Sequence, residues 1–174
     1  FEFADNDVYR AVTHNKGIMN GIISVANAVG QDSRAIEAAA NAYAAISGKY
    51  RSLSKWSKNE NGDLVGILEI PLSVGIVGGI VNVHPVAKVC AKILNVESAQ
   101  ELGCVMVATG LAQNYSAIRA LSTEGIQKGH MRLHARNLAA AAGASTDKID
   151  IVVQKMIENN KISLDGAKEI LQTF

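Results

Sequence analysis

Residues 13–30 read THNKGIMNGIISVANAVG, and their pattern decides the fold. Apolar side chains recur there at steps of three and four residues, as on one face of a helix. Gly30 ends the run, and a second helical stretch follows Asp32 and continues to Gly48. That stretch is rich in alanine, which favours close helix–helix contact. The apolar residues of the first helix are Ile18, Met19, Ile22, Val25, Ala26 and Val29.

The period of the pattern changes after residue 50. Residues 51–58 and 64–70 flank a turn-rich stretch centred on Asn61-Gly62, which predicts a β-hairpin closed by Pro71. The fold class expected is α+β, helix-dominated, with a small antiparallel hairpin or sheet. Further helices are expected over residues 85–94, 98–121 and 124–142, with two short ones around 149–157 and 166–171.

Composition excludes several classes of protein. The 174 residues are 48% hydrophobic and 19% charged, as in ordinary globular proteins, and the net charge of +1 argues against a nucleic-acid binder driven by bulk charge. The longest apolar stretch, residues 64–83, contains Glu69, Pro71 and four glycines, so we expect no membrane span.

Cys90 and Cys104 are expected to be reduced core thiols of a cytoplasmic protein. The start FEFADND, without methionine, suggests an excised piece.

Lys16 lies in a group of polar residues on the first helix. One interpretation is a solvated surface lysine, since lysines are rarely buried unless paired. The other is a donor-rich patch for an anionic or carbonyl-bearing ligand, in which Asp32 keeps the ammonium charged and oriented. This patch would consist of Arg10, Thr13, Asn15, Lys16 and Asn20.

A second group of polar residues lies in GHMRLHARN, residues 129–137. His130 and His134 are four apart and share a helical face. They could be plain surface histidines, metal ligands or acid–base groups. A metal site is disfavoured because Met131 stands where a zinc-protease helix carries glutamate, so no metal is expected. Acid–base chemistry suits imidazole, which titrates near neutrality, and Arg132 and Arg136 would add positive charge for a phosphate-bearing ligand.

Four segments together resemble hydroxymethylglutaryl-coenzyme A (HMG-CoA) reductases of the bacterial and archaeal class, class II. The resemblance covers essentially the whole chain and corresponds to the C-terminal portion of the family. The segments are VTHNKGIMNGI at 12–22, VGQDSRAIEA at 29–38, TGLAQNYSAIRALSTEGI at 109–126 and GIQKGHMRLHARN at 125–137.

The resemblance implies roles for ten residues. It places the family's catalytic lysine, aspartate and histidine at Lys16, Asp32 and His130. It implies that the hydroxymethylglutaryl group is held by Arg10, Thr13 and Asn20. It implies that the coenzyme A moiety lies near Gln113, His134, Arg136 and Asn137.

The resemblance also implies domains, cofactors and partners. Residues 1–124 would be part of the large substrate-binding domain and residues 125–174 the C-terminal flap, with the small cofactor-binding domain absent. The activity implied is reduction of HMG-CoA to mevalonate and coenzyme A with NADH or NADPH, or the reverse, in a homodimer with active sites at the subunit interface. The isolated chain is expected to be inactive. The alternative is a non-catalytic acyl-CoA-binding module or an inactive fragment.

Overall fold

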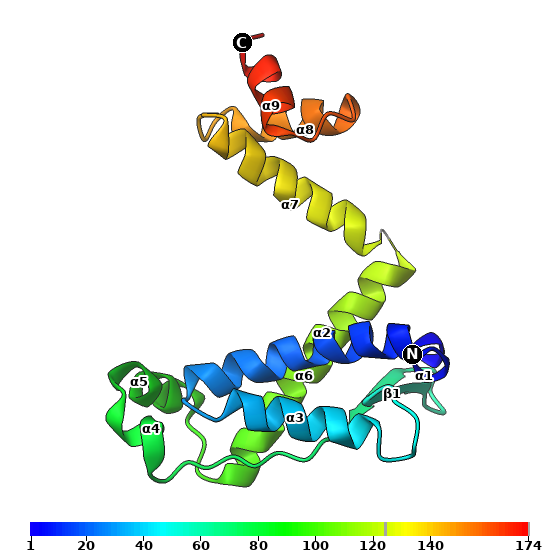
Figure 1. The fold of residues 1–174 in the computed structure, drawn as a ribbon, viewed down its shortest axis with the longest axis vertical. Coiled ribbons are helices and arrows are strands. Elements are labelled where there is room, and N and C mark those ends of the chain that lie inside the picture. Colours follow the sequence, from blue (N-terminus) through cyan, green and yellow to red (C-terminus); the bar gives the residue numbers. More distant parts are fainter. Residues whose placement is uncertain (124, 174) are drawn as a thin grey trace. The chain divides into compact units, whose positions relative to one another are not determined.

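The computed structural model describes residues 1–123 and 125–173, apart from the side chains of residues 127–129. Contacts divide the chain into two compact units, Phe1–Ile118 (the first unit) and Arg119–Phe174 (the second unit). The division falls at residues 118/119, inside a helix, whereas the sequence suggested 124/125. Whether the units are the substrate domain and the flap stays a prediction. Figure 1 shows the helices of both units and the hairpin of the first unit.

Two antiparallel helices form one side of the first unit. Helix α2 (Val8–Ala28) follows a short helix, α1 (Glu2–Asn6), and α3 (Ser33–Ala44) lies beside it (Figure 1). Aspartates begin both helices: Asp7 accepts a hydrogen bond from the Arg10 amide at 2.7 Å, and Asp32 accepts from the Arg34 and Ala35 amides. Helix α2 therefore begins five residues before Thr13, and α3 ends before Gly48, at which it was expected to stop.

The core of the first unit forms where α2 crosses helix α6 (Ala99–Ser122). Two glycines allow the close crossing: a Cβ on Gly21 would lie 2.8 Å from the Thr109 carbonyl oxygen, and one on Gly110 would lie 2.8 Å from Ile22. The expected apolar face of α2 is buried here and packs on α3 and α6. Its main buried members are Ile18, Met19, Ile22, Ala26, Val29, Ile36, Ala40, Leu102 and Met106.

The hairpin forms as expected from the Asn61-Gly62 turn. Strands β1 (Ser54–Lys58) and β2 (Leu64–Leu68) pair antiparallel, and Gly62 has φ +85°. Trp56 faces Gly66 across the pair, where a Cβ would lie 2.6 Å from the indole ring. A side chain at position 66 would therefore displace Trp56, whose indole is used in the buried network described below.

The glycine-rich stretch after Pro71 contains one helix that was not expected. Gly78 and Gly79 adopt positive φ and lead into α4 (Gly79–Val83), and α5 (Pro85–Leu94) follows with proline in its first turn. The side chain of Gln31 holds this stretch, because it donates to the Gly75 carbonyl at 2.8 Å and accepts from the Gly75 amide at 2.9 Å. One side-chain amide thus satisfies both backbone groups of a residue 44 positions away.

Helix α6 begins at the expected capping box. The Ser98 hydroxyl accepts from the Glu101 amide at 3.1 Å, and the Glu101 carboxylate accepts from the Glu97 amide at 2.8 Å. The expectation that both cysteines are core thiols was wrong for Cys104, which is exposed on α6, whereas Cys90 is half-buried. Both cysteines are free.

Three helices make up most of the second unit: α7 (Ile126–Ala141), α8 (Ile149–Glu158) and α9 (Leu164–Leu171). Their boundaries match the three expected helical segments closely. The buried side chains that the structure describes between them are all apolar. They are Ala135, Ala139, Ile149, Val152, Val153, Met156, Ala167 and Ile170.

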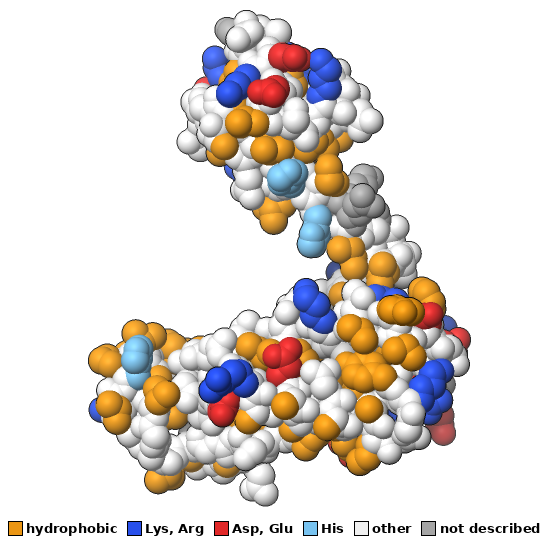
Figure 2. Space-filling view, in the orientation of Figure 1, with side chains coloured by type: hydrophobic (Ala, Val, Ile, Leu, Met, Phe, Trp, Pro, Cys, Tyr) orange, Lys and Arg blue, Asp and Glu red, His pale blue; other side chains and the backbone are white. Residues whose placement is uncertain are grey.

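The structure confirms the fold class, a helix-dominated α+β chain with one small antiparallel sheet among the described residues. Within those residues, no helix combines the length and the apolar character needed to cross a bilayer. Figure 2 shows lysine and arginine side chains scattered over the visible face of the first unit, without one dominant basic patch.

Candidate functional site

One exposed face of α2 carries four of the residues singled out from the sequence. At 100° per residue, Arg10, Thr13, Lys16 and Asn20 fall on the same side of the helix, opposite the face that packs into the core. Thr13, Lys16 and Asn20 are exposed and Arg10 is half-buried. This face, called the Lys16 face below, presents an ammonium, a guanidinium, a hydroxyl and an amide to solvent.

Two neighbours of Lys16 point the other way. His14 and Asn15 are buried, with 4% and 1% of their surfaces exposed. Asn15 donates to the Arg51 carbonyl at 2.8 Å and accepts from the Leu53 amide at 3.0 Å. Including Asn15 in the ligand-binding patch was therefore wrong, because both ends of its amide are used to hold the chain that enters β1.

His14 lies in a buried polar network that joins α2, β1 and α6. Its Nε2 is 2.7 Å from the Ser54 hydroxyl and 3.1 Å from Asn114 Nδ2. The Asn114 Oδ1 accepts from Ser54 at 2.9 Å and from the Trp56 indole at 2.8 Å. Burial, and next the positive charge of Arg10, lower the pKa of His14 to about 4. The imidazole is therefore neutral at pH 7.

Asp32 does not reach Lys16 within one chain. Twelve residues of unbroken α2 separate Lys16 from the end of that helix at Ala28, a rise of about 18 Å at 1.5 Å per residue. The Asp32 carboxylate is exposed at the start of α3 and accepts two backbone amides there. Both residues remain predicted site residues, but Lys16 and Asp32 of one chain lie too far apart for this Asp32 to orient this ammonium.

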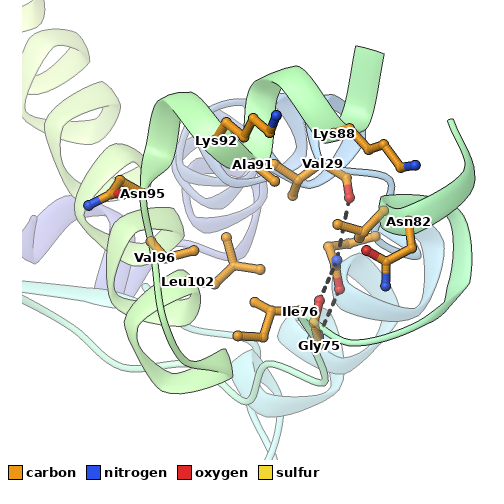
Figure 3. Close-up of a pocket in the computed structure, with 12 residues that line it drawn as sticks. Val29, Gly75, Ile76, Asn82, Lys88, Ala91, Lys92, Asn95, Val96 and Leu102 are labelled. Carbon is orange, nitrogen blue, oxygen red and sulfur yellow. Dashed lines mark hydrogen bonds between the residues drawn. The ribbon is translucent and has the colours of Figure 1, made fainter. Parts of the chain in front are cut away.

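A hollow of about 550 Å³ lies beside Gln31, the residue before Asp32 in the sequence. The end of α2, the segment at Gly75, α4, α5 and the start of α6 surround it, as Figure 3 shows. Val29, Ile76 and Leu102 line its apolar part, while Lys88 and Lys92 project from α5 at its rim. The sequence did not single out this hollow, because its lining comes from five separate segments.

Gln113 lies on α6 and is exposed, directly before Asn114 of the buried network. The exposed residue predicted to contact the substrate is thus adjacent to the buried residue that bonds His14. The same alternation occurs on α2, where buried His14 and Asn15 precede exposed Lys16.

The remaining predicted site residues lie on α7, in the second unit. His130, His134, Arg136 and Asn137 are all exposed. Arg136 donates to the Asp150 carboxylate of α8, so its guanidinium already has an anionic partner. Among the described residues, no three His, Cys, Asp or Glu side chains are grouped as a metal site.

The sequence did not identify His14, Ser54 and Asn114 as a connected group. His14 was not among the predicted site residues, whereas the structure gives both ring nitrogens protein partners. A local signal existed, because His14 falls beside the apolar stripe of α2. Its partners lie 40 and 100 residues away, however, and only tertiary structure brings them to it.

Comparisons with known proteins agree on one family. The family model described as hydroxymethylglutaryl-coenzyme A reductase matches residues 2–135. A 3-hydroxy-3-methylglutaryl-coenzyme A reductase of Archaeoglobus fulgidus is 55% identical over 172 residues, which is 99% of this chain and 39% of the relative. A probable reductase of the same name from Borreliella burgdorferi is 44% identical over 94% of this chain and 38% of its own length.

Solved structures of the same family match this chain. The Streptococcus pneumoniae 3-hydroxy-3-methylglutaryl-coenzyme A reductase superposes with a TM-score of 0.69 at 42% identity, over 99% of this chain and 41% of that one. A second structure, of the class II enzyme from that organism bound to NADPH in open conformations, gives the same TM-score over 42% of its chain. This chain thus spans about two fifths of the length of the relatives it matches.

Proposed function

Since this chain belongs to the hydroxymethylglutaryl-coenzyme A reductase family, we propose that it is part of an enzyme that interconverts HMG-CoA with mevalonate and coenzyme A, using NADPH or NADH. The observation that carries the proposal is the Lys16 face of α2, which presents Arg10, Thr13, Lys16 and Asn20 together to solvent. These are the residue types needed to hold a carboxylate and a polarised carbonyl.

Lys16 has the central role in the proposed reaction. When the thioester is reduced, negative charge develops on its carbonyl oxygen, and a fixed ammonium lowers the energy of that charge. Arg10 suits the substrate carboxylate, because a guanidinium can bind both of its oxygens. We assign the nicotinamide site to a part of the reductase outside this chain, because the chain spans about two fifths of the length of the relatives it matches.

His130 is proposed as the acid that protonates the departing coenzyme A thiolate. Imidazole has a pKa of about 6.5 and a thiol about 8.5, so an imidazolium can transfer its proton to the thiolate. His130 is exposed on α7 of the second unit, which leaves its ring accessible to a ligand. Carrying this acid on a mobile flap would delay protonation until both substrates are bound.

A homodimer with active sites at the interface is part of the proposal. Lys16 and Asp32 are held apart by α2 in one chain, so an Asp32 that orients Lys16 would come from a second copy. Ser24 lies midway between them in sequence and is exposed on the Lys16 face. A two-fold axis near Ser24 would place Lys16 of each copy toward Asp32 of the other.

The first test asks whether this chain supports catalysis. The chain replaces the matching segment of the Archaeoglobus fulgidus reductase, and the product is called the chimera below. We expect the chimera to oxidise NADPH or NADH with HMG-CoA, and Lys16→Ala to lower kcat by roughly 10²–10³-fold. The chain alone, given the same substrates, is expected to show no turnover. An active Lys16→Ala chimera would contradict the role of Lys16.

The role of His130 has its own test. His130→Gln in the chimera should slow reduction of the thioester but spare reduction of free mevaldehyde, from which no thiolate departs. Equal losses with the two substrates would remove His130 from the thiolate step.

Mixing two inactive variants tests the shared site. Dimers that combine a Lys16→Ala subunit with an Asp32→Ala subunit retain one site with both groups intact. Random mixing makes half of the dimers mixed, so roughly a quarter of the parent activity should return. If both groups came from one chain, those dimers would contain no intact site and mixing would restore nothing.

The alternative is a non-catalytic acyl-CoA-binding module. It predicts that the chain binds HMG-CoA but that the chimera does not oxidise the nicotinamide. Calorimetric titration of HMG-CoA alongside the activity assay separates the two functions.

A further inference from the structure

We propose that His14, Ser54 and Asn114 form a positioning network that fixes the Lys16 face of α2 relative to α6 and β1. The inference rests on the proposed function in one respect, because it takes Lys16 to act on the substrate. None of the three residues is itself proposed to touch substrate, since their exposed fractions are 4%, 0% and 1%.

The three residues of the network contact one another in a closed ring. A neutral imidazole has one donor and one acceptor nitrogen. With the proton on Nε2, His14 donates to the Ser54 hydroxyl at 2.7 Å, and Ser54 donates to Asn114 Oδ1 at 2.9 Å. Asn114 Nδ2 lies against the imidazole, 3.1 Å from Nε2 and 3.5 Å from Nδ1. Every member has a partner, and no buried side-chain polar atom among the described residues lacks one.

The ring has a defined geometry because each member comes from a different element. His14 belongs to α2, Ser54 to β1 and Asn114 to α6. The Trp56 indole fixes the Asn114 amide further by donating to its Oδ1 at 2.8 Å. Rotation or sliding of α2 would break directional bonds in a dry environment, where an unpaired polar group is costly. Apolar packing alone resists such a shift much less.

Asn15 provides a second attachment one residue nearer to Lys16. Its amide bonds the backbone of Arg51 and Leu53, at the entry to β1. Two consecutive residues of α2 are therefore bonded to the segment 51–54 from inside, and Lys16 follows on the opposite side of the helix. The order of residues places the buried attachments directly beside the reactive amine.

The network also connects two predicted site residues. Asn114 follows exposed Gln113 on α6, and His14 precedes Lys16 by two positions on α2. The bond between Asn114 and His14 therefore sets the spacing between the backbones that carry Gln113 and Lys16. Misplacing a catalytic group by about 1 Å can cost roughly 10²-fold in rate, so loss of this bond should affect catalysis as well as stability.

The kinetic test compares three variants in the chimera. Ser54→Ala deletes the hydroxyl, so that His14 Nε2 and Asn114 Oδ1 each lose the hydrogen bond made with Ser54. We expect kcat to fall roughly tenfold to hundredfold, while KM for HMG-CoA changes less than about twofold. Ser54→Thr keeps a hydroxyl and should recover most of that kcat. Ile36→Val removes one buried methyl group elsewhere in the same core and should lower the thermal midpoint without lowering kcat.

Hydrogen exchange on the 174-residue chain tests, without an activity assay, whether the network fixes α2. Amides of residues 12–20 should exchange faster in Ser54→Ala than in Ile36→Val, when the two are compared at equal distance below their thermal midpoints. Helix α9, in the second unit, should exchange alike in both. If α2 exchanges equally in the two variants, the network does not fix the Lys16 face and the proposal is wrong.

The two measurements separate the positioning proposal from the proposed function. An unsubstituted chimera without activity would contradict the reductase function, while the exchange data would still decide whether the network holds α2. An active chimera in which kcat follows only the thermal midpoint across all three variants would overturn positioning and leave the reductase function standing.

Discussion

The two units of this chain are stabilised in different ways. The core of the first unit contains four buried polar residues, His14, Asn15, Ser54 and Asn114, and each is hydrogen-bonded. The core of the second unit, in the part that the structure describes, is made only of alanine and larger aliphatic side chains and methionine. Directional bonds specify the first core, whereas apolar packing alone specifies the second.

The candidate site residues of the two units therefore project from helices that are held in place differently. In the first unit, Lys16 projects from a helix whose other side is bonded to β1 and α6. In the second unit, His130 and His134 project from α7, whose buried side contributes Ala135 and Ala139 to an apolar core. Under the proposed function, a precisely held Lys16 would stabilise a developing charge, and His130 on a simple helical body would suit the proposed flap.

The largest effect is expected in the second unit, where one side chain is a large share of a small core. Met156 is fully buried, and Met156→Ala should lower the free energy of unfolding by about 2–5 kcal/mol. Ile151→Ala, on the same helix but 48% exposed, is the control and should change it by less than about 1 kcal/mol. Circular dichroism melts measure both. Similar losses in the two variants would contradict the assignment of this core.

The next largest effect is the pH dependence of stability that buried His14 gives to the first unit. Folded His14 stays neutral down to a pKa of about 4, while the unfolded chain takes up a proton near 6.5. Between those values the unfolded state binds more protons, so His14 lowers stability as pH falls from 6.5 to 4. The loss is on the order of 2–3 kcal/mol and is measured by urea unfolding at pH 7 and 4.5.

Two variants serve as controls for this pH effect. His14→Gln should remove that part of the pH dependence, because glutamine does not titrate. His130→Gln, an exposed substitution in the second unit, should leave the dependence of the first unit unchanged. An identical pH profile in the parent and in His14→Gln would show that His14 is not held neutral.

A smaller effect distinguishes two glycines of α2. Gly21→Ala places a Cβ 2.8 Å from the Thr109 carbonyl oxygen at the crossing with α6 and should destabilise by about 1–3 kcal/mol. Gly17→Ala meets nothing within 4 Å and should stabilise by roughly 0.5–1 kcal/mol, because alanine favours the helix. Thermal melts of the two variants should shift in opposite directions. A shift in the same direction would mean that the crossing is looser than described.

The smallest effect concerns the ion pair between Arg136 and Asp150, which are both exposed. Asp150→Asn should change the free energy of unfolding of the second unit by less than about 1 kcal/mol, since water and salt screen such pairs. Adding salt to the parent should have a similarly small effect. A loss comparable with that of Met156→Ala would mean that electrostatics contributes to this unit as much as its core does.

Local sequence patterns predicted most of the elements. The apolar steps from Ile18 to Val29, the Asn61-Gly62 turn and the Ser98 capping box each act over a few residues, and each formed as expected. Helix α4 was missed because Gly78 and Gly79 argue against regular structure, although their positive φ values simply turn the chain into a helix. Cys104 was assigned to the core because an apolar stretch on a long helix does not reveal which side faces solvent.

The candidate site, like the fold, was predicted only in part from the sequence. Sequence motifs selected Lys16, Asp32 and His130, and their presence together in order led to the family. Only the structure shows that Lys16 and Asp32 lie near different parts of α2, and that Asn15 faces away from the Lys16 face. A motif specifies which residues are neighbours along the chain, but helix length and direction decide which of them can meet.

The sequence by itself determined most of the helices, the hairpin and the family, because these depend on spacings within a few residues and on long motifs. Tertiary structure alone decided the bonding of His14 to Ser54 and Asn114 and the close crossing at Gly21, since these contacts join residues 40 to 100 positions apart. Such contacts depend on how whole elements pack, and no periodicity along the chain encodes them.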